Sequence, residues 1–190
     1  MADKLYIIFA GINGAGKSTL YRSGAWQRPD FPKDMERINS DEILKANCGD
    51  WSSQADQIHA MKEAVKRIDA CFELGCSFNQ ETTLAGKRCI QDIIRAHGLG
   101  FKVIMFYIGV NNPQIANTRI AYRVSVGGHS IAPDIVERRF TASISNLKTA
   151  ISICDEVYLF DNSFELTLIM AYRKGVLVLE RTNPTVTWMP

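Results

Sequence analysis

The sequence predicts a single three-layer α/β domain with a mainly parallel sheet, on three observations. Apolar runs without alternation, such as residues 5–10 and 101–110, are typical of strands buried on both faces of a parallel sheet. Segments with apolar residues at three- and four-residue spacing, which is typical of helices, separate these runs. The chain has 190 residues, 46% of them hydrophobic, which is enough for one sizeable core. Alternating strands and helices favour a doubly wound sheet, which binds ligands at the carboxyl ends of its strands.

The first half of the chain gives two strands and a long helix. LYIIFA, residues 5–10, is the first strand, and a second short strand is predicted at about 36–39. Ser52 or Ser53 can cap a helix that runs to about Glu73 and ends at Gly75. The apolar positions expected to face the core are Ile58, Met61, Ala64, Val65, Ile68 and Phe72.

The second half continues the same alternation. The helix within ETTLAGKRCIQDIIRAHGLG is expected to turn Ile90, Ile93 and Ile94 inward. A helix that starts at NNP is interrupted by GGH at 127–129, and Pro133 opens a further helix that reaches about Ile151. The tail around RKG fits a two-stranded hairpin or a last helix–strand pair. The predicted strands of this half are CSFNQ, FKVIMFYIGV and EVYLF.

Charge and cysteine content exclude several classes of protein. Lys and Arg number 22 and Asp and Glu number 20, a net charge of +2, with no long run of either sign, so no nucleic-acid or membrane partner is expected. The five cysteines are scattered and fit reduced thiols better than a zinc site or disulfides. LYIIFA is too short for a signal-peptide core, and no run reaches membrane-spanning length. A cytoplasmic location is therefore expected.

The strongest motif is GINGAGKS, residues 11–18, which fits the P-loop pattern G-x-x-x-x-G-K-[ST] between a strand and a helix. Its glycines allow successive backbone N–H groups to point at one anion, and the helix N-terminus favours negative charge. Lys17 is expected to bridge the β- and γ-phosphates of ATP, and the Ser18 hydroxyl to ligate Mg²⁺. The predicted nucleotide-binding residues of this loop are Gly11, Asn13, Gly14, Ala15, Gly16, Lys17, Ser18 and Thr19.

Asp41 favours phosphoryl transfer over hydrolysis. P-loop hydrolases usually carry a long apolar strand that ends in a metal-binding Asp, whereas VIMFYIGVNN ends without an acid. Asp41 follows the second strand, where a carboxylate could take the proton of an acceptor hydroxyl. The alternative is that Asp41 is only the N-cap of the helix begun by SDEI, a place that Ser40 could fill equally well.

Other polar residues are expected at the same edge of the sheet. Glu81, Thr82 and Thr83 follow the third strand and could bind acceptor hydroxyls or water on the metal, or be only a helix cap with an exposed carboxylate.

Four arginines and a glycine break suggest a lid. Arg119 and Arg123 lie four residues apart on one predicted helix, and Arg138 and Arg139 begin the next one, after VGGHSIAP. A lid of about residues 119–140 would close over ATP, exclude water and supply cations to the transferring group; the alternative is a solvated basic face. His129 is expected to shape the lid or contact phosphate.

These pieces together resemble the zeta-toxin family of P-loop kinases, especially its short members. The matching segments are GINGAGKST, NSDEI, ETTL, RIAYRVSVGGHSIAPDIVERRF, SISNL and DEVYLFDNS, which span most of residues 5–163. The resemblance implies a mononucleotide-kinase-like fold that uses ATP and Mg²⁺, with Asp41 as the base and Glu81 and Thr83 near the acceptor. It also implies Arg123 and Arg138 at the phosphates and Asp161 and Asn162 in the loop near the adenine. The family's best-known members phosphorylate UDP-N-acetylglucosamine and are held off by a small antitoxin, so both features are expectations here.

The expected function is that of a kinase with a small-molecule hydroxyl acceptor, in one P-loop domain over residues 1–190 with a C-terminal appendage at about 164–190. Lys17, Asp41, Arg123 and Arg138 are the predicted catalytic residues. Two alternatives stay open. One is a kinase for the 5′ end of a nucleic acid, and the other is an ATP-binding switch that signals to a partner.

Overall fold

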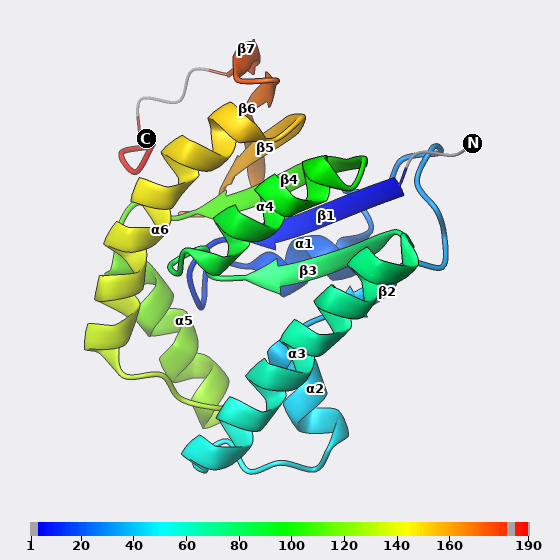
Figure 1. Cartoon of the computed structure of the whole chain (residues 1–190). Helices are drawn as coiled ribbons and strands as arrows, with labels where there is room; N and C mark the ends of the chain where they lie inside the picture. Colours follow the sequence, from blue (N-terminus) through cyan, green and yellow to red (C-terminus); the bar gives the residue numbers. More distant parts are fainter. Residues whose placement is uncertain (1–3, 182–184, 190) are drawn as a thin grey trace.

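The computed structural model describes residues 4–181 and 185–189 and forms a sheet with helices on both faces (Figure 1). The sheet order is β2-β3-β1-β4-β5-β6-β7, in which the first five strands pair in parallel and β6 and β7 are antiparallel. The predicted α/β class with a mainly parallel sheet is thereby confirmed. The strands are β1 (Lys4–Ala10), β2 (Glu36–Ile38), β3 (Phe78–Thr82), β4 (Phe101–Gly109), β5 (Glu156–Asp161), β6 (Thr167–Arg173) and β7 (Val176–Glu180). The helices are α1 (Lys17–Ser23), α2 (Ser40–Ala46), α3 (Gln54–Leu74), α4 (Arg88–Gly98), α5 (Pro113–Ser125) and α6 (Pro133–Ile153).

Alternate residues of the central strand β1 belong to two separate cores, one on each face of the sheet. Tyr6 and Ile8 join the core that includes residues of α2, α3, α4 and α6, while Ile7 and Phe9 join the core that includes α1 and α5. Residues 5–10 of β1 are covered on both faces and form a continuous buried run, as the sequence predicts, whereas Lys4 at the start of the strand is exposed. Register places Phe9 opposite Glu81 on β3, so the end of β3 lies beside the loop that follows β1.

Three helical side chains predicted to face the core are in fact exposed. Ile58 and Met61 of α3 are 44% and 61% exposed, and Ile94 of α4 is 60% exposed. The inward face of α4 carries Asp92 and Ala96 instead, and Met61 borders a cavity rather than the core. Apolar spacing alone therefore misplaces these three side chains. Ser53, one of the two predicted caps, accepts the N–H of Asp56 at the start of α3.

The C-terminal segment completes the sheet and then returns to the end of β4. β6 and β7 form the hairpin that was one of the two predicted possibilities. Trp188 donates its indole N–H to the buried carboxylate of Asp161 at 2.8 Å and fills the space beside Gly109, which a Cβ would occupy. Residues 1–3, 182–184 and 190, parts of the predicted domain and appendage, lie outside the described residues. No helix in the described part of the chain is both long and apolar enough to cross a membrane.

A cluster around Glu156 ties the loop after α1 to the sheet. Its carboxylate accepts from Arg28 at 2.7 Å and Tyr158 at 2.6 Å and lies 2.6 Å from the Lys102 ammonium. Burial alone would raise the pKa of Glu156, but the hydrogen bonds from Lys102, Tyr158 and Arg28 outweigh burial and lower it to about 2.

Glu156→Gln is expected to cost about 1–3 kcal/mol of unfolding free energy at pH 7, because it removes a charge that three donors stabilise. A lowered pKa stabilises the fold above the unfolded value of 4.5, and this contribution is lost as the pH falls toward 2. Urea unfolding of both proteins from pH 7 to pH 2 measures the difference, which should shrink through that window. A difference that stays constant with pH would contradict the role assigned to the carboxylate.

Candidate active site

The loop between β1 and α1 folds as a phosphate-binding loop. Gly11 has φ 134°, a value that favours glycine, and a Cβ there would overlap the carbonyl oxygen of Ile108 on the neighbouring strand. Helix α1 starts at Lys17, and no side chain caps its first turn. The Thr19 N–H donates to the Gly16 carbonyl at 3.1 Å, so the N–H groups of Lys17 and Ser18 are those left for an anion.

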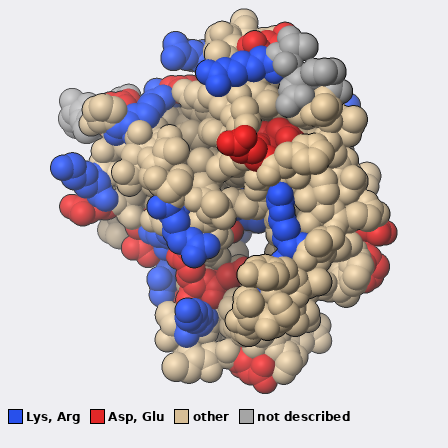
Figure 2. All heavy atoms as spheres, turned by 180° about the vertical axis from the view of Figure 1, so that it is seen from behind, with Lys and Arg blue, Asp and Glu red and all other residues tan. Residues whose placement is uncertain are grey.

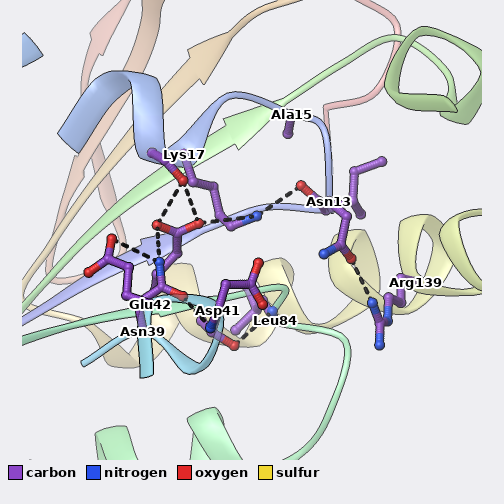
Figure 3. Close-up of polar contacts among 12 residues, drawn as sticks. Asn13, Ala15, Lys17, Asn39, Asp41, Glu42, Leu84 and Arg139 are labelled. Atoms are coloured by element: carbon purple, nitrogen blue, oxygen red, sulfur yellow. Dashed lines mark hydrogen bonds and ion pairs between the residues drawn. The ribbon is translucent and has the colours of Figure 1, made fainter. Parts of the chain in front are cut away.

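Lys17 is buried at the centre of the site and faces acids. Its ammonium donates to the Ile12 carbonyl at 3.0 Å and lies 3.9 Å from a carboxylate oxygen of Glu81. Burial lowers the pKa of Lys17, while the Glu81 and Asp41 carboxylates oppose that shift. Figure 3 shows the Lys17 side chain extending across the centre of the site, with Asp41 close by.

The Glu81 carboxylate accepts hydrogen bonds from three parts of the chain. The Ser18 hydroxyl donates to its two oxygens at 3.1 and 3.2 Å, Arg37 donates at 2.7 Å and Asn39 at 3.1 Å. Arg37 and Asn39 have no role in the sequence-based prediction. Their position at the end of β2 and directly after it, just before Asp41, was the available signal, but only the folded sheet brings them to Glu81.

The pair formed by Ser18 and Glu81 fits a magnesium site. A hydroxyl and a carboxylate offer the oxygen ligands that Mg²⁺ prefers, and Mg²⁺ commonly completes its shell with phosphate oxygens and water. The described residues contain no group of three His, Cys, Asp or Glu side chains that could cage a metal. The Ser18 hydroxyl and the Glu81 carboxylate thus suit a metal whose other ligands are phosphate oxygens and water.

Asp41 lies in the first turn of α2, and the alternative that it or Ser40 is the N-cap is wrong. The cap is Asn39, whose side chain accepts the Asp41 N–H at 2.9 Å. The Asp41 side chain is 45% exposed, and one of its oxygens is 3.6 Å from His129 Nε2. The carboxylate is thus free of the capping role and faces the open space of the site.

Two cavities meet at this centre. The first, of about 380 Å³, is lined by the phosphate loop, and the second, of about 510 Å³, lies between α2, α3, the end of β3 and the start of α6. Asn13, Lys17, Asp41 and Glu81 line both cavities. The predicted nucleotide residues that line the first cavity are Asn13, Gly14, Gly16, Lys17, Ser18, Thr19 and Asn162. The other two predicted residues of the loop, Gly11 and Ala15, are buried and do not line the first cavity. Thr83 lines the second cavity.

Asn162, from the loop after β5, packs against the phosphate loop. Its side-chain amide donates to the Ala15 carbonyl at 2.7 Å, and its own carbonyl accepts from Arg119 at 2.7 Å. The neighbouring Asp161 instead accepts from Trp188 and Ser163 and lines neither cavity. Asn162 alone of this pair reaches the nucleotide side of the site.

The four arginines of the predicted lid separate into two kinds. Arg119 and Arg123 line the first cavity, and Arg139 lines the second, where it donates to Asn13 at 2.7 Å (Figure 3). Burial lowers the pKa of all three guanidinium groups, although they stay charged. Within the described residues, Arg123 Nε is a buried donor without a hydrogen-bond partner, as expected of a group that awaits a ligand. Arg138, the predicted phosphate contact, is exposed and lines neither cavity, because one step along a helix turns a side chain by about 100°.

The fold is that of P-loop proteins, with the phosphate-binding loop between β1 and α1. A chain of the PezAT toxin–antitoxin system of Streptococcus pneumoniae has the same fold, with a TM-score of 0.62, 16% identity, and coverage of 88% of this chain and 72% of that one. The AvrRxo1-ORF1:-ORF2 structure with ATP gives a TM-score of 0.68 and 16% identity over 94% of this chain, which spans only 61% of that one.

The family is shown by a closer relative. A Haemophilus influenzae protein of uncharacterized function is 36% identical over 136 residues, which cover 70% of this chain and 91% of that protein. The chain belongs to the same family as this protein. No protein-family model matches the sequence.

Proposed function

We propose that the protein is an ATP-dependent kinase that moves the γ-phosphoryl group to a hydroxyl of a small-molecule acceptor. The observation that carries the proposal is the meeting of two cavities at Lys17, Asp41 and Glu81. A hydrolase needs one substrate cavity and a water, whereas a transferase must hold donor and acceptor end to end. The phosphate loop marks the first cavity as the donor side, so the second is the acceptor side.

In this proposal the chain supplies a base and a set of cations. Asp41 takes the proton of the acceptor hydroxyl while the oxygen of that hydroxyl bonds to the γ-phosphorus. At the same time the bond from the γ-phosphorus to the β–γ bridging oxygen breaks, and ADP leaves. Lys17 and Arg123 stabilise the charge that develops on the phosphoryl oxygens. Arg139, rather than the exposed Arg138, is the second lid arginine at the reacting centre.

Ser18 and Glu81 would hold Mg²⁺, which neutralises phosphate charge when bound. Arg37 and Asn39 keep the Glu81 carboxylate aimed at Ser18, as their hydrogen bonds at 2.7 and 3.1 Å support.

The acceptor is first sought among UDP-amino sugars, because the resemblance to zeta toxins implies that class. Glu81 and Thr83 would contact it from the end of β3. The description of one structural neighbour as a toxin–antitoxin system supports a protein partner as part of this proposal. Co-purification with the product of an adjacent gene tests that part.

A mass-spectrometric transfer assay with Mg·ATP tests the proposal. The panel is led by UDP-N-acetylglucosamine and includes a 5′-hydroxyl oligonucleotide, which the interspersed acidic and basic side chains on the face shown in Figure 2 do not favour. A small acceptor that gains one phosphoryl group supports the proposal. Phosphate on the oligonucleotide would make the protein a polynucleotide kinase, and ATP binding without transfer to any acceptor would favour a nucleotide switch.

A further inference from the structure

The loop that joins α2 to α3 holds Trp51 on a fixed support. Ser52 donates its backbone N–H and its hydroxyl to the Asp50 carboxylate, each at 2.8 Å, and the Asp50 N–H donates to Asp56 at 2.9 Å. The Trp51 carbonyl accepts from Gln57 at 2.7 Å, and the partly buried Trp51 packs against the core that includes residues of α3. The position of Trp51 is therefore determined by its own segment.

His129, from the loop between α5 and α6, stacks on this indole. The ring centroids are 3.8 Å apart and the planes differ by 7°. Figure 1 shows the α5–α6 loop reaching across to the start of α3, so segments far apart in the chain meet here. Burial lowers the pKa of His129 more than the nearby Asp41 raises it, which favours the neutral ring that stacks without desolvating a charge.

His129 is also held from the side of the reacting centre. Arg123 donates to the His129 carbonyl at 2.9 Å, and His129 Nε2 lies 3.6 Å from the Asp41 carboxylate. Gly128 has to be glycine for this arrangement, because a Cβ would overlap the Arg123 side chain. One residue thus contacts the tryptophan, a phosphate-side arginine and the proposed base.

The stack lies in the wall of the acceptor cavity. Trp51 and His129 both line the second cavity, from opposite segments, together with Ser130 and Ile131 of the same loop. A single stacking contact is weak compared with the folding of the domain, so it can open and re-form in each catalytic cycle.

We infer that Trp51 and His129 form a clasp, which closes the second cavity around the acceptor and holds Asp41 toward the reacting hydroxyl. Both are positioning residues, since Asp41 carries out the proton transfer. The clasp excludes water from the γ-phosphate while the acceptor is bound. The effect of the clasp on catalysis rests on the proposed kinase function, whereas the stack itself does not.

The stack is tested first without any acceptor. Subtracting the emission of Trp51→Phe from that of the wild type isolates Trp51 from the other two tryptophans. Acrylamide quenching of Trp51 is expected to rise about twofold in His129→Ala, because one face of the indole is uncovered, and to stay unchanged in Tyr122→Ala, which removes an exposed ring of α5. Equal quenching in the wild type and His129→Ala overturns the clasp whatever the enzyme does.

The catalytic role is tested by steady-state kinetics of transfer and of ATP hydrolysis. Trp51→Ala and His129→Ala are expected to raise the acceptor KM about tenfold and the ratio of hydrolysis to transfer severalfold, with the ATP KM nearly unchanged. Trp51→Phe restores most of the loss, because phenylalanine can still stack. A fall in kcat with no change in acceptor KM or in the hydrolysis ratio, and without rescue by phenylalanine, overturns the positioning role. If the wild-type protein phosphorylates no acceptor, both the proposed function and this positioning role are overturned. The quenching experiment then still tests whether Trp51 and His129 stack.

Discussion

Asp41→Asn is expected to lower the rate of phosphoryl transfer by about 10³-fold, because a positioned general base contributes roughly 10²–10⁴-fold. ATP binding should change little, since asparagine keeps the size of the side chain and removes only a partly exposed negative charge. The measurement pairs single-turnover transfer with titration of a fluorescent ATP analogue.

Asp134→Asn is the matched control for this substitution. Asp134 is also an acidic residue in the first turn of a helix, but it is exposed and lines neither cavity. Both variants lose the same charge beside a helix N-terminus, so a difference in activity between them isolates the site. Preserved turnover in Asp41→Asn would remove Asp41 from the base role, and equal losses in both variants would point to helix stability.

The sequence predicts the part of the site whose residues lie close together along the chain, namely the phosphate-binding loop. GINGAGKS needs only its own glycines and the adjacent strand and helix, so residues 11–18 fold as the motif indicates. Arg37 contacts Glu81 across the sheet and lies 3.5 Å above the Tyr21 ring, and no local pattern specifies either contact. No local pattern specifies the stack of Trp51 and His129 either, because the two residues come together only in the folded chain.

The errors in the fold have a related cause. Apolar periodicity reports that one face of a helix avoids water, but it does not say whether a core or a ligand cavity covers that face. Met61 fits the inward pattern of α3 and in fact borders the second cavity. In α4, Ile94 is exposed although its spacing predicts an inward position, while the charged Asp92 is buried because Arg88 pairs with its carboxylate at 2.8 Å. Of the two α3 residues that deviate from the pattern, Met61 lines the candidate acceptor cavity and Ile58 does not.

Lys17→Met is expected to lower kcat by about 10²–10³-fold, the usual loss when one preorganised donor to transition-state charge is removed. The loss is not offset by neighbours, because Glu81 and Asp41 would then face the phosphates with less positive charge between them. The thermal midpoint should stay the same or rise: burial disfavours the charged ammonium, and methionine fills the space without that cost. Lys148→Met, at an exposed position of α6, should change neither quantity. Stopped-flow transfer and calorimetry on the three proteins decide the matter, since a variant that loses activity and melting temperature together would make Lys17 a structural residue instead of a catalytic one.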